Sequence, residues 1–138
     1  MAVIKWRQAY ATGIVTLDNE HKGLIAELNR LYEAVRDKRG QAVLSDTIGM
    51  LERYTVDHFQ HEERLMADYK FPGLEEHRRI HQGLIADVAQ MKERSQEGGE
   101  VPARELLKFM REWLLNHIMQ VDQQYGPYLE ARGGRFID

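Results

Sequence analysis

Apolar residues recur every three or four positions along four segments of this chain, which is the spacing of helices that bury one face. The four helices that this spacing predicts cover about residues 18–38, 41–67, 74–95 and 102–125. Residues that end or break helices separate the segments, namely Gly40, Pro72-Gly73 and Gly98-Gly99. Asp18 can cap the first helix, and Pro102 suits the first turn of the fourth. Four amphipathic helices with short connections predict an all-α, antiparallel up-down-up-down four-helix bundle.

The two ends of the chain lack this helical period. Residues 1–17 contain Trp6 and Tyr10 without sustained spacing, so we expect an N-terminal arm that packs on the bundle. Gly133-Gly134 indicates a short, loose C-terminal tail. Because no repeat, low-complexity segment or linker divides the chain, we expect residues 1–138 to form a single domain.

The composition narrows the partners and the chemistry. With 43% hydrophobic and 30% charged residues the chain is typical of a soluble globular protein, and 138 residues suffice to bury a core. A net charge of −3 without a basic stripe argues against nucleic acid and against an anionic membrane surface. No apolar run could span a bilayer and the N-terminus lacks a signal-peptide pattern, so we expect no membrane insertion and a cytoplasmic location. The absence of cysteine leaves nitrogen and oxygen atoms to hold any metal.

Metal-ligating side chains occupy the apolar stripe of every predicted helix. Five of the six histidines and two carboxylates form this set: His21, His58, Glu62, His77, His81, His117 and Asp122. On two of the helices the paired ligands are four positions apart, which places them about 40° from each other and lets both face one centre. Buried ionisable groups are costly without compensation, so their convergence in one core indicates a bound cation.

Taken one at a time, these residues would be weak indicators of a metal. A lone histidine on an apolar face, such as His21, is more often a hydrogen-bonded core residue than a ligand. Single His-x-x-x-His pairs are common on exposed helices. The combination on four helices favours a metal site. His61 lies beside the pair formed by His58 and Glu62 but off its line, and we interpret it as a flanking residue.

Seven ligands are too many for one transition-metal ion that must also bind something else. If two six-coordinate ions share both carboxylates and an oxygen from water, one coordination position stays open for a small diatomic ligand. Histidine-rich ligation by nitrogen and oxygen suits iron, and manganese, cobalt and zinc remain open on ligand type alone.

Longer motifs around these residues resemble those of the hemerythrin family, in particular its stand-alone bacterial members, over nearly the whole chain. The motifs are Thr12-Gly13-Ile14, Leu17-Asp18-x-Glu20-His21-Lys22, His58-Phe59-x-x-Glu62-Glu63-x-x-Met66, His77-x-x-x-His81 and Trp113-Leu114-x-x-His117-Ile118-x-x-x-Asp122. The resemblance implies two iron ions, joined by an oxo or hydroxo bridge, that bind O2 reversibly. It also implies that Leu114 lines the oxygen pocket.

The resemblance further divides the ligands between the two irons. The coordinatively saturated iron would be held by three histidines: His77, His81 and His117. The iron with the open position would be held by two: His21 and His58. Both irons would share the two carboxylates: Glu62 and Asp122.

The spacing between His117 and Asp122 departs from regular helix geometry. Residues five apart lie about 140° from each other around a helix, so the two side chains would not face one centre. We therefore predict a π-bulge, a local widening of the helix, between Leu114 and Asp122.

These features favour an oxygen carrier or store that works as a monomer and is not an enzyme. The alternatives are a di-iron redox enzyme acting on nitric oxide or peroxide, and an oxygen- or iron-sensing module. The histidine excess disfavours the enzyme, because ferritin-like di-iron proteins use more carboxylates and Glu-x-x-His motifs. An oxygen-consuming protein could be the partner that receives the O2.

Overall fold

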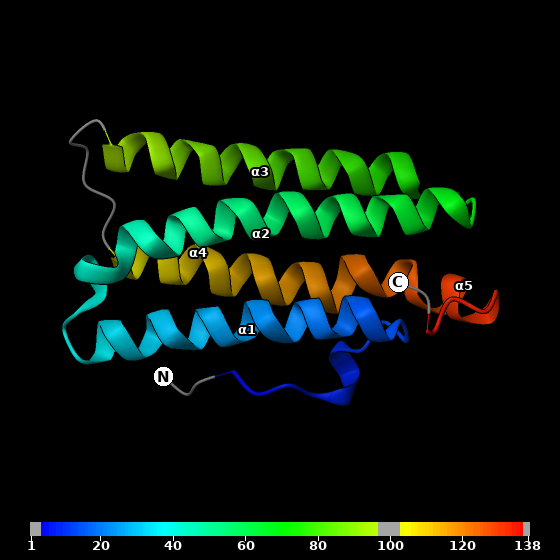
Figure 1. Ribbon diagram of the computed structural model, residues 1–138, viewed down its shortest axis with the longest axis horizontal. Helices are drawn as coiled ribbons and strands as arrows, with labels where there is room; N and C mark the ends of the chain where they lie inside the picture. The colour runs from blue at the N-terminus through cyan, green and yellow to red at the C-terminus, as the bar shows by residue number, and fades with distance from the viewer. Residues whose placement is uncertain (1–3, 97–102, 137–138) are drawn as a thin grey trace.

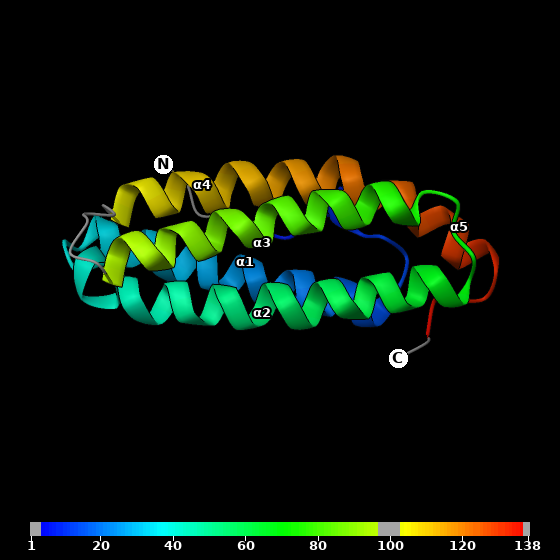
Figure 2. The same cartoon turned by 90° about the horizontal axis from the view of Figure 1, so that it is seen from above.

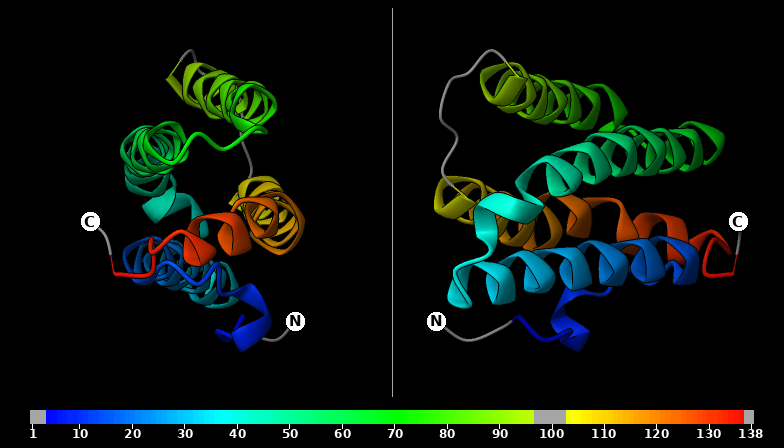
Figure 3. Two further views of the ribbon diagram at one scale, coloured as in Figure 1. Left: turned by 90° about the vertical axis from the view of Figure 1, so that its right-hand side faces the viewer. Right: turned by 60° about the vertical axis from the view of Figure 1, so that its left-hand side comes forward.

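Four long helices form the body of the molecule in the computed structural model, which describes residues 4–96 and 103–136. They are α1 (Val15–Arg36), α2 (Gly40–Asp68), α3 (Leu74–Gln96) and α4 (Ala103–Asn116). Successive helices run in opposite directions (Figures 1 and 2), and α2 lies beside both α1 and α3, while α4 lies beside α1. Seen along the long axis, the four helices surround a common core (Figure 3). The predicted all-α, up-down-up-down bundle is confirmed, and the described residues contain no strand.

The fourth helix is interrupted well before its expected end. After α4 the chain continues as a π-helical turn, η2 (His117–Val121), and a 3₁₀ turn, η3 (Asp122–Gln124). A short final helix, α5 (Gly126–Ala131), then turns across the end of the bundle (Figure 1). Two features expected just before α4, the proline at position 102 and the glycines at 98 and 99, lie outside the described residues.

The N-terminal arm joins the bundle through Asp18, although not as a helix cap. Helix α1 begins at Val15, earlier than expected, and no side chain caps it. The Asp18 carboxylate accepts hydrogen bonds from the backbone N–H and the hydroxyl of Thr12 instead, at 2.7 and 2.8 Å. The expected cap was therefore wrong. Burial of Ile14 and Leu17 extends the helix towards the arm, so that Asp18 lies within the first turn and not before it.

Two apolar clusters divide the interior. The larger one fills most of the bundle and includes the fully buried Leu31 and Leu51. The smaller one lies where the arm, α5 and the turn between α2 and α3 meet, and it includes Ile14, Leu65 and Tyr125. Burial of this kind supplies most of the stabilisation of an amphipathic bundle, at about 25 cal/mol per Å² of apolar surface.

The arm follows the bundle as an extended strap with one short helical turn, η1 (Gln8–Tyr10). The backbone N–H of Ile4 donates to the side-chain amide of Asn29 in α1, and the same amide donates to the Ile4 carbonyl. The side chain of Gln123 donates to the Tyr10 carbonyl. A glycine is required at position 126, because a Cβ atom there would collide with the Thr12 carbonyl. Among the described residues, no helix has the length and apolar character that crossing a bilayer requires.

Candidate metal centre

All seven side chains singled out by the sequence meet inside the bundle, and none is more than 3% exposed. They come from α1, α2, α3 and the turns that continue α4. His21 lies on α1, His58 and Glu62 on α2, His77 and His81 on α3, His117 on η2 and Asp122 on η3. The two apolar clusters enclose them. Phe59 of the larger cluster stacks on the His81 ring, with ring centroids 3.8 Å apart, and Tyr125 of the smaller cluster lies 5.4 Å from the His77 ring.

The seven side chains form two overlapping groups, each with potential ligand atoms within 4.8 Å of one another. One group holds three histidines and two carboxylates: His77, His81, His117, Glu62 and Asp122. The other holds two histidines and the same carboxylates: His21, His58, Glu62 and Asp122. Because both carboxylates belong to both groups, the arrangement can hold two neighbouring metal ions with shared carboxylate ligands.

The Asp122 carboxylate is oriented to serve both groups. Its Oδ2 lies 3.0 Å from His21 Nε2, whereas its Oδ1 lies 3.1 Å from His77 Nε2 and 3.0 Å from His117 Nε2. Each oxygen therefore faces the histidines of a different group. A carboxylate in this orientation can place one oxygen on each of two metal ions.

One oxygen of Glu62 lies close to a histidine of each group. Its Oε1 lies 3.2 Å from His58 Nε2 and 3.3 Å from His81 Nε2. Its Oε2 accepts a short hydrogen bond from the buried Tyr125 hydroxyl. The tyrosine thereby fixes the carboxylate, and nothing in the spacing around Tyr125 would have indicated this role from the sequence.

Several polar atoms at this centre are buried without hydrogen-bond partners, which tests whether the residues fit a metal. The unpartnered atoms include Nε2 of His21, His58 and His77, Oε1 of Glu62 and both oxygens of Asp122. So many unsatisfied buried groups are rare in folded proteins and costly. Coordination to cations would satisfy them together, and a set of imidazole nitrogens and carboxylate oxygens suits iron.

The helix widens where His117 and Asp122 must face the same centre. The π-helical turn spans His117–Val121, and His117 Nε2 lies 3.0 Å from Asp122 Oδ1 at its end. The predicted π-bulge is confirmed. Because five residues on a regular helix would separate the two side chains by about 140°, the wider turn is what brings them together.

Two carboxylates that the sequence analysis did not assign hold the outer nitrogens of ligand histidines. His58 Nδ1 lies 2.5 Å from Glu20 Oε1, and His81 Nδ1 lies 2.8 Å from Glu63 Oε2. Such contacts fix the ring and direct Nε2 inward. Each carboxylate adjoins a ligand in the sequence, which was the available signal. His61 lies outside both groups and bonds through Nδ1 to the second oxygen of Glu20, at 2.7 Å.

In the metal-free centre, the pKa shifts favour a protonated His58 and an ionised Asp122. Burial lowers the pKa of His58, but the carboxylates of Glu62 and Glu20 outweigh burial and raise it to about 10. Burial raises the pKa of Asp122, yet the surrounding histidines, His117 foremost, bring it well below its usual value. The carboxylate therefore stays ionised while His58 stays protonated. A metal ion entering the site must displace such protons.

The surroundings of the centre are aromatic on one side and hollow on another. The Trp113 ring stacks on His117 with centroids 5.8 Å apart. A surface hollow of about 320 Å³, lined in part by Tyr54 and Asp57, reaches His58 from outside. The side chain of Leu114 lies outside the described part of the structure, so its expected place in an oxygen pocket stays a prediction.

Comparison with known proteins gives one consistent family. The family model described as "Hemerythrin HHE cation binding domain" matches residues 12–129 of this chain. A bacteriohemerythrin of Pseudomonas aeruginosa is 35% identical over 125 residues, which cover 91% of this chain and 80% of that protein. A bacteriohemerythrin of Stenotrophomonas maltophilia is 32% identical over 136 residues, 99% of this chain and 88% of that protein. A crystal structure of wild-type hemerythrin superimposes with a TM-score of 0.81 at 28% identity, covering 91% of this chain and 97% of the other.

Proposed function

Because the chain belongs to the hemerythrin family, we propose that it binds O2 reversibly at a di-iron centre and carries, stores or delivers oxygen. The observation that carries this proposal is the unequal division of the seven side chains. Three histidines serve one metal position and two serve the other, and both positions share two carboxylates. The position with fewer histidines is the one with room for O2.

The same division supports an assignment of ligands. One iron would be held by three histidines: His77, His81 and His117. The iron with an open position would be held by two: His21 and His58. Glu62 and Asp122 would bridge the pair. When bound, the iron pair supplies the redox chemistry of reversible O2 binding.

The chain's own residues would shape that chemistry in three ways. Two ionised carboxylates compensate part of the charge of the metal ions, and Tyr125 holds one of them by a hydrogen bond. Glu20 and Glu63 keep two imidazoles in the orientation that directs Nε2 inward. The apolar clusters on both sides exclude water, which would favour release of intact O2 over its conversion to reduced products.

We propose a binding protein and not an enzyme. Five of the seven candidate ligands are histidines, whereas ferritin-like di-iron proteins rely on carboxylates and Glu-x-x-His motifs. The rival function is redox turnover of nitric oxide or peroxide. Turnover of either substrate by the iron-loaded protein at a rate above that of free iron would favour the rival.

The deciding experiment is spectroscopic. Metal-free protein is loaded anaerobically with Fe²⁺, and its visible and near-ultraviolet absorption is followed through repeated cycles of air and argon. Reversible charge-transfer bands at two irons per chain are expected. Bleaching after one cycle, or bands that argon does not remove, would contradict reversible binding.

Three finer parts of the proposal concern the state, the location and the partner of the protein in the cell. We expect it to act as a monomer in the cytoplasm, delivering O2 to an oxygen-consuming partner. Size-exclusion chromatography of the iron-loaded protein tests the first part. Fractionation of the source cells tests the second.

A further inference from the structure

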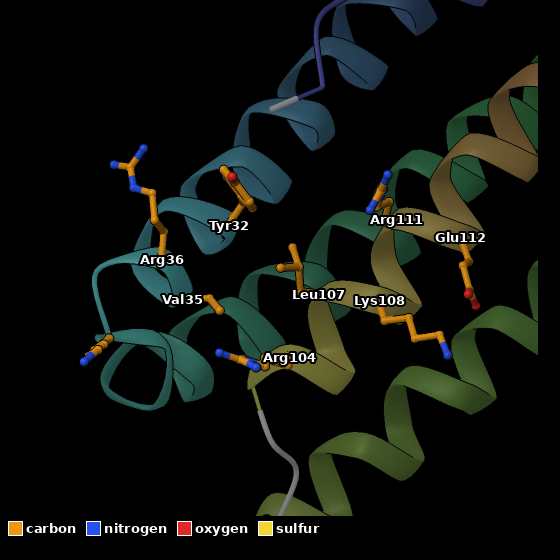
Figure 4. Close-up of a pocket in the computed structure, with 9 residues that line it drawn as sticks. Tyr32, Val35, Arg36, Arg104, Leu107, Lys108, Arg111 and Glu112 are labelled. Atoms are coloured by element: carbon orange, nitrogen blue, oxygen red, sulfur yellow. The ribbon is translucent and has the colours of Figure 1, made fainter. Parts of the chain in front are cut away.

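A groove separate from the metal centre lies between α1 and α4, at the end of the bundle where α4 begins (Figure 4). Its volume is about 810 Å³. Tyr32 and Val35 of α1 and Leu107 of α4 point towards the gap between the two helices and form an apolar floor. A second hollow of about 270 Å³ shares Val35 with the groove and continues it towards Gly40.

Positive charge surrounds this floor. Five of the lining residues are basic and one is acidic, on a chain whose net charge is −3. Arg36 is paired with its neighbour Asp37. No described carboxylate lies within ion-pair distance of the other basic residues: Lys38, Arg104, Lys108 and Arg111. Within residues 4–96 and 103–136, the groove therefore offers four cationic groups without an ion-paired carboxylate.

Two of these cations have a definite spacing. Arg104 and Arg111 are seven residues apart on α4, so they lie on the same face, about 10.5 Å apart along the axis. Leu107 lies between them, and Arg104 extends towards Val35 across the gap (Figure 4). Lys108 points away from α1. The groove thus presents charge, apolar surface and charge again in the repeat of an α-helix.

The N-terminal arm indicates what kind of segment packs on the surface beside the groove. Ile4, Trp6 and Tyr10 of the arm pack against the main core, and Ile4 is bonded to Asn29 of α1. Tyr32 lies almost one turn beyond Asn29, and no described arm residue lines the groove. The neighbouring stretch of the surface is therefore covered by an amphipathic segment, whereas the described part of the arm, from Ile4 onward, does not cover the groove.

We propose that this groove is a docking site for an acidic amphipathic helix of a partner protein. The bound helix would carry two carboxylates seven residues apart, paired with Arg104 and Arg111. Apolar side chains between the carboxylates would lie on Tyr32, Val35 and Leu107. This is the helix-in-groove mode of recognition, in which apolar anchors give affinity and charge gives specificity and rapid association. The proposal does not depend on the iron chemistry.

A designed peptide tests the proposal on the iron-loaded full chain. The probe is a fluorescein-labelled helical peptide of about 18 residues with Glu at positions seven apart and two Leu between them. Two comparison peptides carry Lys for Glu, or Ser for Leu. Fluorescence anisotropy at low ionic strength should show binding of the first peptide only. The affinity should fall as salt is added.

The protein variants locate the binding. Arg104→Glu with Arg111→Glu should weaken binding of the acidic peptide about tenfold or more, with the reversible O2 spectrum retained. A matched control, Arg7→Glu with Arg53→Glu, changes two exposed arginines elsewhere and shifts the net charge equally. Equal weakening by both pairs would mean non-specific attraction and overturn the proposal.

Two further outcomes would also overturn it. Equal binding of all three peptides would show that neither the charge nor the apolar face is recognised. Displacement of the acidic peptide by dodecanoate, but not by dodecyltrimethylammonium, would identify a pocket for small anionic amphiphiles instead of a protein helix.

Discussion

At the residue scale, the ligand histidines differ in what holds their outer ring nitrogen. His58 and His81 each have a carboxylate there, from Glu20 and Glu63. Glu20 is itself shared with His61, so one partly buried histidine is linked through a carboxylate to a fully buried one. Carboxylate partners of this kind orient a ligand and raise its basicity. The centre thus extends one layer beyond the side chains that would touch metal.

The variant Glu20→Gln tests the importance of that outer layer. An amide can still hydrogen-bond but carries no charge, so we expect iron affinity to fall by about 10- to 100-fold while two irons still bind at saturation. Competition with a chelator of known affinity measures the change. Asp57→Asn is the control, because Asp57 is exposed and lines the same surface hollow without bonding a ligand histidine. Equal losses in the two variants would argue against an orienting role for Glu20.

Two histidine substitutions separate candidate ligands from their neighbours. His77→Ala removes a nitrogen from the group of three histidines and should lower iron content below two per chain. His61→Ala removes a histidine outside both groups and should leave two irons bound. Iron analysis of both purified proteins gives the comparison. Full iron content in His77→Ala would contradict the ligand assignment.

The raised pKa of His58 makes metal binding depend on pH. Its value of about 10 lies above the usual 6.5, so the imidazole is protonated in metal-free protein throughout neutral pH. Because a metal ion must expel that proton, affinity should rise with pH, about tenfold per pH unit for each proton displaced. Titration with Co²⁺ from about pH 6 to pH 8 measures the slope. An affinity independent of pH over that range would show that His58 is not a ligand.

At the element scale, the sequence predicted the helices where burial is periodic and failed where another interaction decides. The four helices appear because apolar residues of α1 to α4 repeat at the spacing of one buried face. The start of α1 was misplaced, because Asp18 resembles a cap but serves Thr12 of the arm. That contact depends on where a distant part of the chain returns, which local spacing does not encode.

The π-helical turn was predictable for a different reason. Two candidate ligands five residues apart cannot both face one centre on a regular helix, so the requirement for His117 and Asp122 to converge predicted the distortion. The exact placement of the turn at His117–Val121, and the 3₁₀ turn that follows, came only from the structure. Functional constraint was here a stronger guide than helix propensity.

Deleting one residue from the π-helical turn tests this account. Removal of exposed Gln120 leaves His117 and Asp122 four positions apart, which suits a regular helix, so we expect two irons to remain bound. Removal of exposed Glu112 from the regular part of α4 instead rotates everything beyond it by about 100° and should abolish binding. Iron analysis and circular dichroism compare the two deletions. Loss of iron from the Gln120 deletion alone would contradict this reading of the turn.

At the scale of the whole molecule, the centre joins α1, α2 and α3 to the turns that continue α4. Metal ions that bind only the folded chain stabilise it by mass action, by about 2.7 kcal/mol for each site at a concentration 100 times the dissociation constant. Chelation should therefore lower the unfolding temperature by several degrees. Calorimetry of iron-loaded and metal-free protein measures this. Identical unfolding temperatures would mean that the ligands are not held by metal in the folded state.

The convergence of the candidate ligands could be predicted from the sequence, but their mutual geometry could not. Each candidate ligand lay on an apolar stripe, and four stripes that share one core must meet. The spacing did not show which oxygen of Asp122 faces which histidine, or that Tyr125 holds Glu62. The groove lined by Leu107 could not be predicted from the sequence either, because its basic residues form no run in the sequence and meet only across two helices.

Asp122 belongs to both metal positions, and this has a consequence for biosynthesis. His21 and Asp122 are neighbours in space, although nearly the whole bundle is translated between them. When α1, α2 and α3 have emerged from the ribosome, the nascent chain still lacks His117 and one of the two carboxylates that both positions share. Iron captured by that partial chain would be bound incompletely. Insertion of the metal pair should therefore follow completion of the polypeptide, so that a fully loaded centre marks a chain that has finished folding.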